Sequence, residues 1–372
     1  MQHEMILDGT KIEWYLDRVR AWERGERIAP ITIDMALTTC CNMKCIFCYS
    51  QLQRDEKKTI KREHITRFLE DCSTIGVKGV SLVSDGESSI SPDFAYTIKH
   101  GASKGLAMAT GTNAYLLKGK MLEEVFPHLS YLRVNISAGE ETRYNKIMGA
   151  HGDMFYQVCK NIETMVRLKE AGFSKCTVGM QMVLMPEFID QVLPLSKLAL
   201  NLGVDYLIIK HCSDDEFGHL GVNYGKYKDT FETLKRAESW STSRTLIKAK
   251  WSKLNECGEE GAVRSYQRCY GPPFVLQISG TGLVAPCGFL FNERYKRFHM
   301  GDITKQGFRE IWESKAYWDI ISELASEKFD ARTMCGSLCL QHSLYKYLDE
   351  YKKGERGLVE PTGKPPIHKE FI

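Results

Sequence analysis

The segment Thr38–Cys48, with the sequence TTCCNMKCIFC, determines how this 372-residue chain is interpreted. It directly follows the apolar run Ile31–Leu37, which predicts a buried β-strand. Cys41, Cys45 and Cys48 form a C-x3-C-x2-C triplet in the loop after that strand. In folds built on parallel strands, active sites lie at the carboxyl ends of the strands. We therefore expect the triplet to lie in the functional site.

The triplet favours an iron–sulfur cluster over a zinc site. Three thiolates on one loop can hold three corners of a [4Fe–4S] cluster and leave the fourth iron open to a ligand. Zinc usually takes four ligands in paired motifs, so an isolated triplet fits zinc poorly. The chain has 13 cysteines and no apolar signal segment at its N-terminus, so a disulfide scaffold is not expected.

The sequence between residues 31 and 210 alternates between two kinds of hydrophobic pattern. Apolar, β-rich runs predict strands at 31–37, 80–83, 106–110, 132–136, 178–184 and 206–209. Helical periodicity predicts helices at 59–75, 94–104, 117–126, 155–171 and 189–202. Because each parallel connection needs a crossover, this alternation predicts an α/β fold with a parallel sheet, either open or curved into a barrel.

Charge and hydropathy exclude two classes of partner. The net charge is only +3, without a long basic run, so a nucleic-acid-binding surface is not expected. No apolar stretch approaches the roughly 18 residues of a membrane span. We therefore expect a cytoplasmic protein with no membrane partner.

The triplet, with the aromatic Phe47 before its last cysteine, resembles that of the radical S-adenosylmethionine (radical SAM) superfamily, and the resemblance spans residues 30–212. It implies a partial (β/α)6 barrel of the TIM type, in which SAM chelates the open iron and Phe47 lies beside the adenine. It also implies that the reduced cluster cleaves SAM to a 5′-deoxyadenosyl radical, which abstracts a substrate hydrogen. An external electron donor such as flavodoxin or ferredoxin would reduce the cluster.

Other strand ends supply the SAM-binding residues that the resemblance implies. Residues 84–88 (SDGES) stand where the family has Gly-Gly-Glu-Pro, so Gly86 and Glu87 match, whereas an aspartate and a serine replace the first glycine and the proline. The further implied contacts are Thr112, Asn113, Asn135, Ser137, Arg143 and Gln181. Arg143 is expected to neutralise the SAM carboxylate, with a solvated position on a helix surface as the alternative.

The sixth predicted strand ends in Lys210-His211-Cys212-Ser213-Asp214-Asp215-Glu216. Seven consecutive polar or reactive residues at a barrel mouth favour contact with the substrate, although a solvated loop is the alternative. We expect Lys210, His211, Asp214 and Glu216 to assist proton transfer, and Cys212 to donate a hydrogen atom.

A second cysteine set lies in the C-terminal third. Cys269 and Cys287 bracket a predicted β-hairpin at 273–286 as C-x12-G-x4-C, and Cys335 and Cys339 follow. This pattern resembles the SPASM/twitch extension of radical SAM enzymes. Four well-placed cysteines imply one auxiliary [4Fe–4S] cluster that is closed by thiolates and moves an electron. A zinc-stapled hairpin is the alternative, and Cys257 and His342 are spare ligands.

These features predict five parts of the chain. They are an N-terminal extension (1–30), the radical SAM partial barrel (31–220), a helical linker (221–262), the SPASM/twitch auxiliary-cluster domain (263–350) and a C-terminal tail (351–372), expected to be extended.

The resemblance implies an oxidoreductase or epimerase that abstracts hydrogen from a small sugar or polyol. The alternative is a maturase that modifies a ribosomally made peptide. The 30 residues before the first predicted strand are few for the leader-binding domain that such maturases commonly carry, which counts against this alternative. A zinc-binding interaction protein without catalytic activity is the third hypothesis.

Overall fold

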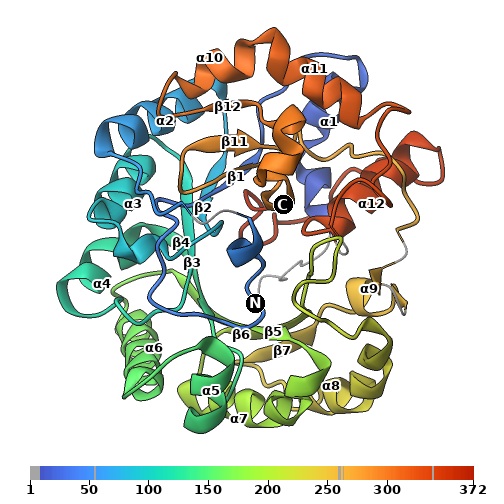
Figure 1. Ribbon diagram of the computed structural model, residues 1–372. Helices are drawn as coiled ribbons and strands as arrows, with labels where there is room; N and C mark the ends of the chain where they lie inside the picture. The colour runs from blue at the N-terminus through green and yellow to red at the C-terminus, as the bar shows by residue number, and fades with distance from the viewer. Residues whose placement is uncertain (1–8, 54–55, 259–260, 263, 337–338) are drawn as a thin grey trace.

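The computed structural model describes residues 9–53, 56–258, 261–262, 264–336 and 339–372. A ten-stranded sheet forms its centre, in the order β12-β11-β10-β1-β2-β3-β4-β5-β6-β7 (Figure 1). The strands are β1 (Thr32–Met35), β2 (Gly79–Leu82), β3 (Ala107–Thr112), β4 (Leu129–Asn135), β5 (Thr177–Leu184), β6 (Tyr206–His211), β7 (Leu246–Ala249), β10 (Val275–Ile278), β11 (Leu283–Ala285) and β12 (Gly301–Asp302). Strands β1 to β7 run parallel, which confirms the predicted α/β fold with a partial barrel.

Helices surround the curved sheet on its outer side (Figure 1). They are α1 (Leu16–Glu23), α2 (Arg62–Ile75), α3 (Phe94–Ser103), α4 (Gly119–Val125), α5 (Glu141–Met148), α6 (Met154–Glu170), α7 (Val192–Leu202), α8 (Phe231–Glu238), α9 (Trp251–Leu254), α10 (Phe308–Glu313), α11 (Lys315–Leu324) and α12 (His342–Lys352). In α2 the apolar residues at three- and four-residue steps, including Ile65, Phe68 and Leu69, are buried against the sheet. Gly76 directly follows the helical pattern of 59–75, a position that predicts a left-handed helix end, and it does end α2 in the left-handed conformation.

Two expectations about local structure are wrong. The segment 221–262 is not only a helical linker, because it contains β7, which extends the sheet beyond β6. The helical pattern at 307–326 predicts a single helix, but the segment forms two helices, α10 and α11. Ser314 lies between them in an extended conformation, and its side chain accepts a hydrogen bond from the main-chain N–H of Tyr317 at 3.2 Å.

The hairpin of the C-terminal cysteine region is part of the same sheet as the barrel. Strand β10 pairs in parallel with β1, in a register that sets Asp34 beside Gln277. Strand β11 then pairs with β10 in the antiparallel direction. Sheet hydrogen bonds therefore fix the position of the hairpin relative to the barrel.

The C-terminal tail packs against the barrel. Residues 367–372 lie across the amino ends of the parallel strands, and Figure 1 shows the C-terminus inside the ring. Lys11 Nζ donates to the carbonyl of Phe371 at 3.0 Å, and Thr32 Oγ1 donates to the carbonyl of Glu370 at 2.7 Å. These six residues form the floor of the barrel. No helix in the described part of the chain is long and apolar enough to cross a bilayer.

Replacing Phe371 with alanine is expected to destabilise the fold. The Phe371 ring is buried and packs edge-on against Tyr131, with ring centroids 5.0 Å apart. We expect the Phe371→Ala variant to lose about 3 kcal/mol of unfolding free energy, measured by urea denaturation followed by circular dichroism. Val359→Ala, at a position 60% exposed in the same tail, is the control and should change stability by less than about 0.5 kcal/mol. Equal denaturation midpoints for the two variants would contradict the packed floor.

Candidate active site

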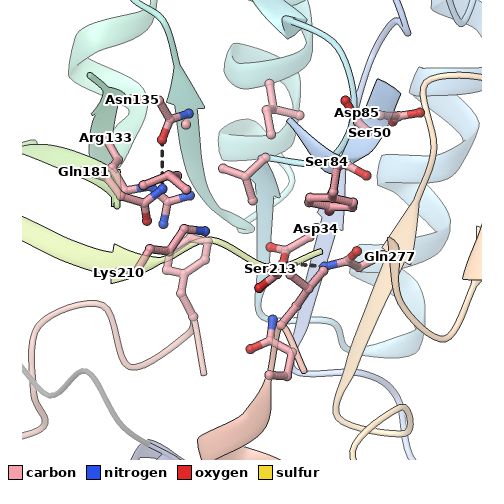
Figure 2. A pocket seen from close by; sticks show the side chains of 18 of the residues that line it. Asp34, Ser50, Ser84, Asp85, Arg133, Asn135, Gln181, Lys210, Ser213 and Gln277 are labelled. Atoms are coloured by element: carbon pink, nitrogen blue, oxygen red, sulfur yellow. Dashed lines mark hydrogen bonds between the residues drawn. The ribbon is translucent and has the colours of Figure 1, made fainter. Parts of the chain in front are cut away.

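A cavity of about 390 Å³ occupies the interior of the curved sheet. The loops after β1 and β2 border it at the carboxyl ends of the strands, and the tail borders it at the floor. Polar side chains from five strands point into it, as Figure 2 shows. These wall residues are Asp34, Arg133, Asn135, Gln181, Lys210 and Gln277.

The three cysteines of the triplet all line this cavity, as the sequence predicts. Their loop rests on the end of α5, a helix that the sequence analysis did not predict. The main-chain N–H groups of Lys44 and Ile46 donate to the carbonyls of Met148 and Ile147 at 3.2 and 3.0 Å. Gly149, the residue after α5, has no room for a side chain beside the main chain of Lys44. Contacts with the end of α5 thus fix the position of the cysteine loop.

The three thiols of the cysteine triplet are suitable ligands for an iron–sulfur cluster. Burial, together with the neighbouring thiols of Cys48 and Cys41, raises the pKa of Cys45 well above its usual value. Burial raises the pKa of Cys41 to about 11. Bound iron would supply the positive charge that stabilises such thiolates. In the described residues no three His, Cys, Asp or Glu side chains converge on one ion, whereas a cluster distributes its ligands over several irons.

Glu87 organises the mouth of the cavity. Its Oε1 accepts hydrogen bonds from Ser89 Oγ at 2.7 Å and from Thr112 Oγ1 at 2.8 Å. Its Oε2 accepts one from the main-chain N–H of Asn113 at 2.7 Å, and Asn113 Nδ2 donates to Asn42 Oδ1 in the cysteine loop at 2.7 Å. The predicted residues Glu87, Thr112 and Asn113 therefore form one network that joins the ends of β2 and β3 to the cysteine loop.

Asp85, which departs from the family pattern, has a structural role. Its two carboxylate oxygens accept hydrogen bonds from Ser279 Oγ at 2.7 Å and from the main-chain N–H of Gly280 at 2.8 Å. A Cβ on Gly86, which has φ +67°, would collide with the carbonyl oxygen of Thr38. A Cβ on Gly280 would collide with the same peptide group of Thr38. Both glycines are required for this close approach of main chains.

Three ionisable groups on the wall have unusual surroundings. Burial is the main cause that raises the pKa of Asp34 to about 6, and Arg133 opposes it. Burial and the charge of Arg133 lower the pKa of Lys210 to about 7. Burial lowers the pKa of His211 well below its usual value, and neither of its ring nitrogens has a hydrogen-bond partner among the described residues. These groups can change protonation state near or below neutral pH.

Three amide side chains, those of Asn135, Gln181 and Gln277, lie beside these groups. Gln181 Nε2 donates to Asn135 Oδ1 at 3.0 Å, and Gln277 Nε2 donates to Asp34 Oδ2 at 3.3 Å (Figure 2). Asn135 and Gln181 were predicted from the strand ends. Asp34, Arg133 and Gln277 were missed, although each is a polar residue alternating with apolar ones in a buried strand.

Several other predicted residues do not line the cavity. Ser137 accepts a hydrogen bond from the N–H of Val183 at 3.1 Å, and Thr112 acts through Glu87. Arg143, expected beside the SAM carboxylate, instead forms an ion pair with Asp190 at 2.6 Å. The structure therefore does not bring Arg143 to the site.

The residues predicted to be catalytic in the loop after β6 likewise do not line the cavity. Cys212 is buried behind the wall, with its thiol 3.6 Å from the carbonyl of Phe47, which itself lines the cavity. Asp214 accepts a hydrogen bond from the N–H of Leu220 at 3.0 Å and so stabilises its own loop. Glu216 forms an ion pair with Arg294 at 2.8 Å. Of the predicted catalytic residues, only Lys210 and His211 line the cavity.

The second cysteine set also converges. Cys269, Cys287, Cys335 and Cys339 lie close enough for their charges to interact. Burial, and after it the charges of the neighbouring thiols, raise the pKa values of Cys269 and Cys287. Arg264 Nη1 donates to Cys335 Sγ at 2.9 Å. A guanidinium beside buried thiols stabilises their thiolate forms, which are the forms that bind metal. The spare ligands Cys257 and His342 are engaged elsewhere, with the carbonyl of Lys253 and the carboxylate of Glu256.

Tyr49, which the sequence analysis missed, lies between the two cysteine sets. It follows Cys48 in the chain and lines the cavity. Its ring contacts that of Phe289, two residues after Cys287, with centroids 5.2 Å apart. Burial, and then the thiol of Cys287, raise the pKa of Tyr49 well above its usual value. An aromatic pair therefore connects the triplet to the second set.

Comparisons with known proteins agree with this geometry. Residues 35–199 match the model of the radical SAM superfamily, and residues 269–339 match that of SPASM, an iron–sulfur cluster-binding domain. The chain is 24% identical to the AdoMet-dependent heme synthase of Methanosarcina barkeri, over 77% of this chain and 83% of that protein. It is 22% identical to the mycofactocin maturase MftC of Mycolicibacterium smegmatis, over 95% of this chain and 88% of that protein.

A solved structure shares the fold. It is SuiB of Streptococcus suis bound to the precursor peptide SuiA, with a TM-score of 0.61 and 17% identity, covering 82% of this chain and 69% of SuiB.

Removing either cysteine set should remove half of the bound iron. After anaerobic reconstitution with iron and sulfide, two [4Fe–4S] clusters correspond to about eight irons per chain. We expect about four irons in the Cys41→Ala/Cys45→Ala/Cys48→Ala variant and about four in Cys269→Ala/Cys287→Ala. Cys159→Ala, at a half-buried position on α6 away from both cysteine sets, is the matched control and should retain the full content. Unchanged iron in the triplet variant, or zinc in place of iron, would contradict the assignment.

Proposed function

Because the chain belongs to the radical SAM superfamily and carries a C-terminal SPASM iron–sulfur domain, we propose that it is a maturase that abstracts a hydrogen atom from a peptide. The observation that carries this proposal is the likeness to MftC, which extends over almost the whole chain and so includes the barrel and both cysteine sets. The solved complex of SuiB with its precursor peptide supports it, since a protein of this fold binds a peptide.

The residues at the mouth have separate tasks in this proposal. Cys41, Cys45 and Cys48 would hold the [4Fe–4S] cluster. When bound, the reduced cluster and SAM supply the one-electron chemistry that removes a hydrogen atom from a substrate carbon. Glu87 and Asn113 fix the loops against which SAM would lie, because their hydrogen bonds join these loops to the cysteine loop.

Lys210 and Asp34 are the residues that would move a proton at the substrate. They face the same cavity from opposite sides, as Figure 2 shows. With a pKa of about 7, the Lys210 amine can accept a proton near neutral pH, and with a pKa of about 6 the Asp34 carboxylate is mostly ionised there. The second cysteine set would accept or return an electron, with Tyr49 and Phe289 lying between the two centres.

A second candidate is the dehydrogenation or epimerisation of a small sugar or polyol. The amide side chains of Asn135, Gln181 and Gln277 favour it, because amides donate to and accept from hydroxyl groups. In an epimerase, a thiol would return the hydrogen atom. Cys212 remains the predicted donor, and loss of solvent deuterium from the product of Cys212→Ala would support that role.

Reductive cleavage of SAM tests the chemistry. The anaerobic protein, given dithionite and SAM, is expected to form 5′-deoxyadenosine, measured by liquid chromatography. Cys45→Ala should form at least a hundredfold less, because the cluster loses a ligand, whereas Cys159→Ala should match the wild type. Intact SAM in the wild-type reaction would contradict radical SAM activity.

The substrate class is decided by mass spectrometry of the same reaction. Peptides encoded beside the gene and a panel of polyols are supplied in parallel. We expect a mass change in a peptide, together with 5′-deoxyadenosine in equal amount. A mass change, or solvent deuterium uptake, confined to a polyol would reject the maturase in favour of the second candidate.

A further inference from the structure

We propose that the cavity binds an anionic group of the substrate, a carboxylate or a phosphate, between Arg133, Lys210 and Lys250. The inference rests on the proposed function in one respect, because it takes this cavity to be the substrate site. It adds the chemical class of the group that the substrate must carry.

The three cations come from neighbouring parts of the sheet. Arg133 lies on β4 and Lys210 on β6, and Lys250 directly follows β7. The main-chain N–H of Lys250 donates to the carbonyl of Ile209 at 2.9 Å, which places Lys250 beside the end of β6. All three line the cavity. Figure 2 shows Arg133 and Lys210 pointing into it from one side, and Asp34 from the other.

None of these three side chains has a hydrogen bond or an ion pair with any described residue of the chain. The Nε of Arg133 is fully buried and without a partner. Lys253, a nearby cation at the same cavity, differs in this respect. Its Nζ donates to the carbonyls of Cys339 and Leu340 at 2.9 and 2.8 Å, so it has a structural role. The free donors of the cluster face the cavity instead.

The surrounding carboxylates do not balance this charge. Asp85 and Glu87, the acids at the mouth, accept hydrogen bonds from their own loops. Among the acidic side chains of the cavity wall, Asp34 faces the cluster, and its pKa is raised to about 6 chiefly by burial. The C-terminal residue Ile372 also lines the cavity, and no ion pair joins its carboxylate to the cluster in the described part of the chain. Burial and neighbouring cations lower the pKa of Lys250 well below its usual value. Buried cations without partners are costly, and an anion placed among them removes that cost.

The carboxylate of SAM does not account for the cluster. SAM brings one carboxylate, whereas Arg133, Lys210 and Lys250 offer three basic groups at one side of the cavity, and a bound anion would favour the protonated form of the two amines. Arginine and lysine together are typical of sites for carboxylates and phosphates. The excess of donors favours a second anion, supplied by the substrate.

Isothermal titration calorimetry of the reconstituted enzyme with bound SAM tests the inference. Succinate is the carboxylate probe and methyl phosphate is the phosphate probe, both at constant ionic strength. We expect the wild type to bind at least one probe, and the Kd to rise at least tenfold in Arg133→Gln and in Lys250→Met. The probe that binds more tightly identifies the group. Lys248→Met is the matched control, because Lys248 lies on β7, half exposed, beside Glu238, and this variant should bind like the wild type.

Three results would overturn the inference. They are a wild type that binds neither probe, equal affinities in all variants, and a loss of SAM affinity in Arg133→Gln and Lys250→Met that equals the loss of probe affinity. The last result would assign the cluster to the cofactor. Failure of the proposed function is a separate observation, since it appears as wild-type enzyme that leaves SAM intact or leaves peptides unmodified while the probes still bind.

Discussion

The crossing of three main-chain segments at the end of β1 is the constraint on which the site depends. The peptide group of Thr38 passes between Gly86 and Gly280, and neither position has room for a Cβ. Asp85 ties the two flanking loops together through the N–H of Gly280. The cysteine loop, the loop after β2 and the hairpin turn are therefore packed against one another without intervening side chains. A change at either glycine would alter the geometry of all three.

The wall of the cavity contains buried polar residues that lower the stability of the fold. A barrel interior can be filled with apolar side chains, whereas this one buries Asp34, Arg133 and Lys210. Such residues reduce stability, because their charges are desolvated and their partners are incomplete. The apolar outer faces of the same strands, covered by helices, compensate for that cost. Local departures from optimal packing of this kind are concentrated at functional sites.

The sequence was sufficient to predict the features that depend on short-range patterns. The cysteine triplet, the six strands from β1 to β6 and the left-handed end of α2 follow from spacing and periodicity. Glu87 and Asn113, which the family resemblance implies as SAM contacts, both line the cavity at the ends of β2 and β3. These features are local, because each depends on residues that are close in the chain.

What the sequence did not predict depends on contacts between distant residues. Strand β7 has four residues among polar neighbours and becomes a strand through its pairing with β6. Arg143 was expected at SAM, but Asp190, from the loop after β5, holds it at 2.6 Å. The proposed anion-binding role of Arg133 depends on Lys210 and Lys250, which follow it in the chain by more than 70 residues. Such proximity is a property of the folded sheet.

The packed tail has a kinetic consequence. Residues 367–372 cover the amino end of the barrel, and the cysteine loop, against which SAM would lie, borders the cavity at the opposite end. A substrate group bound at the inner wall and SAM bound at the mouth would therefore share one approach to the cavity. Sharing one approach would couple the two binding events, so a large excess of SAM would slow the arrival of substrate and the departure of product.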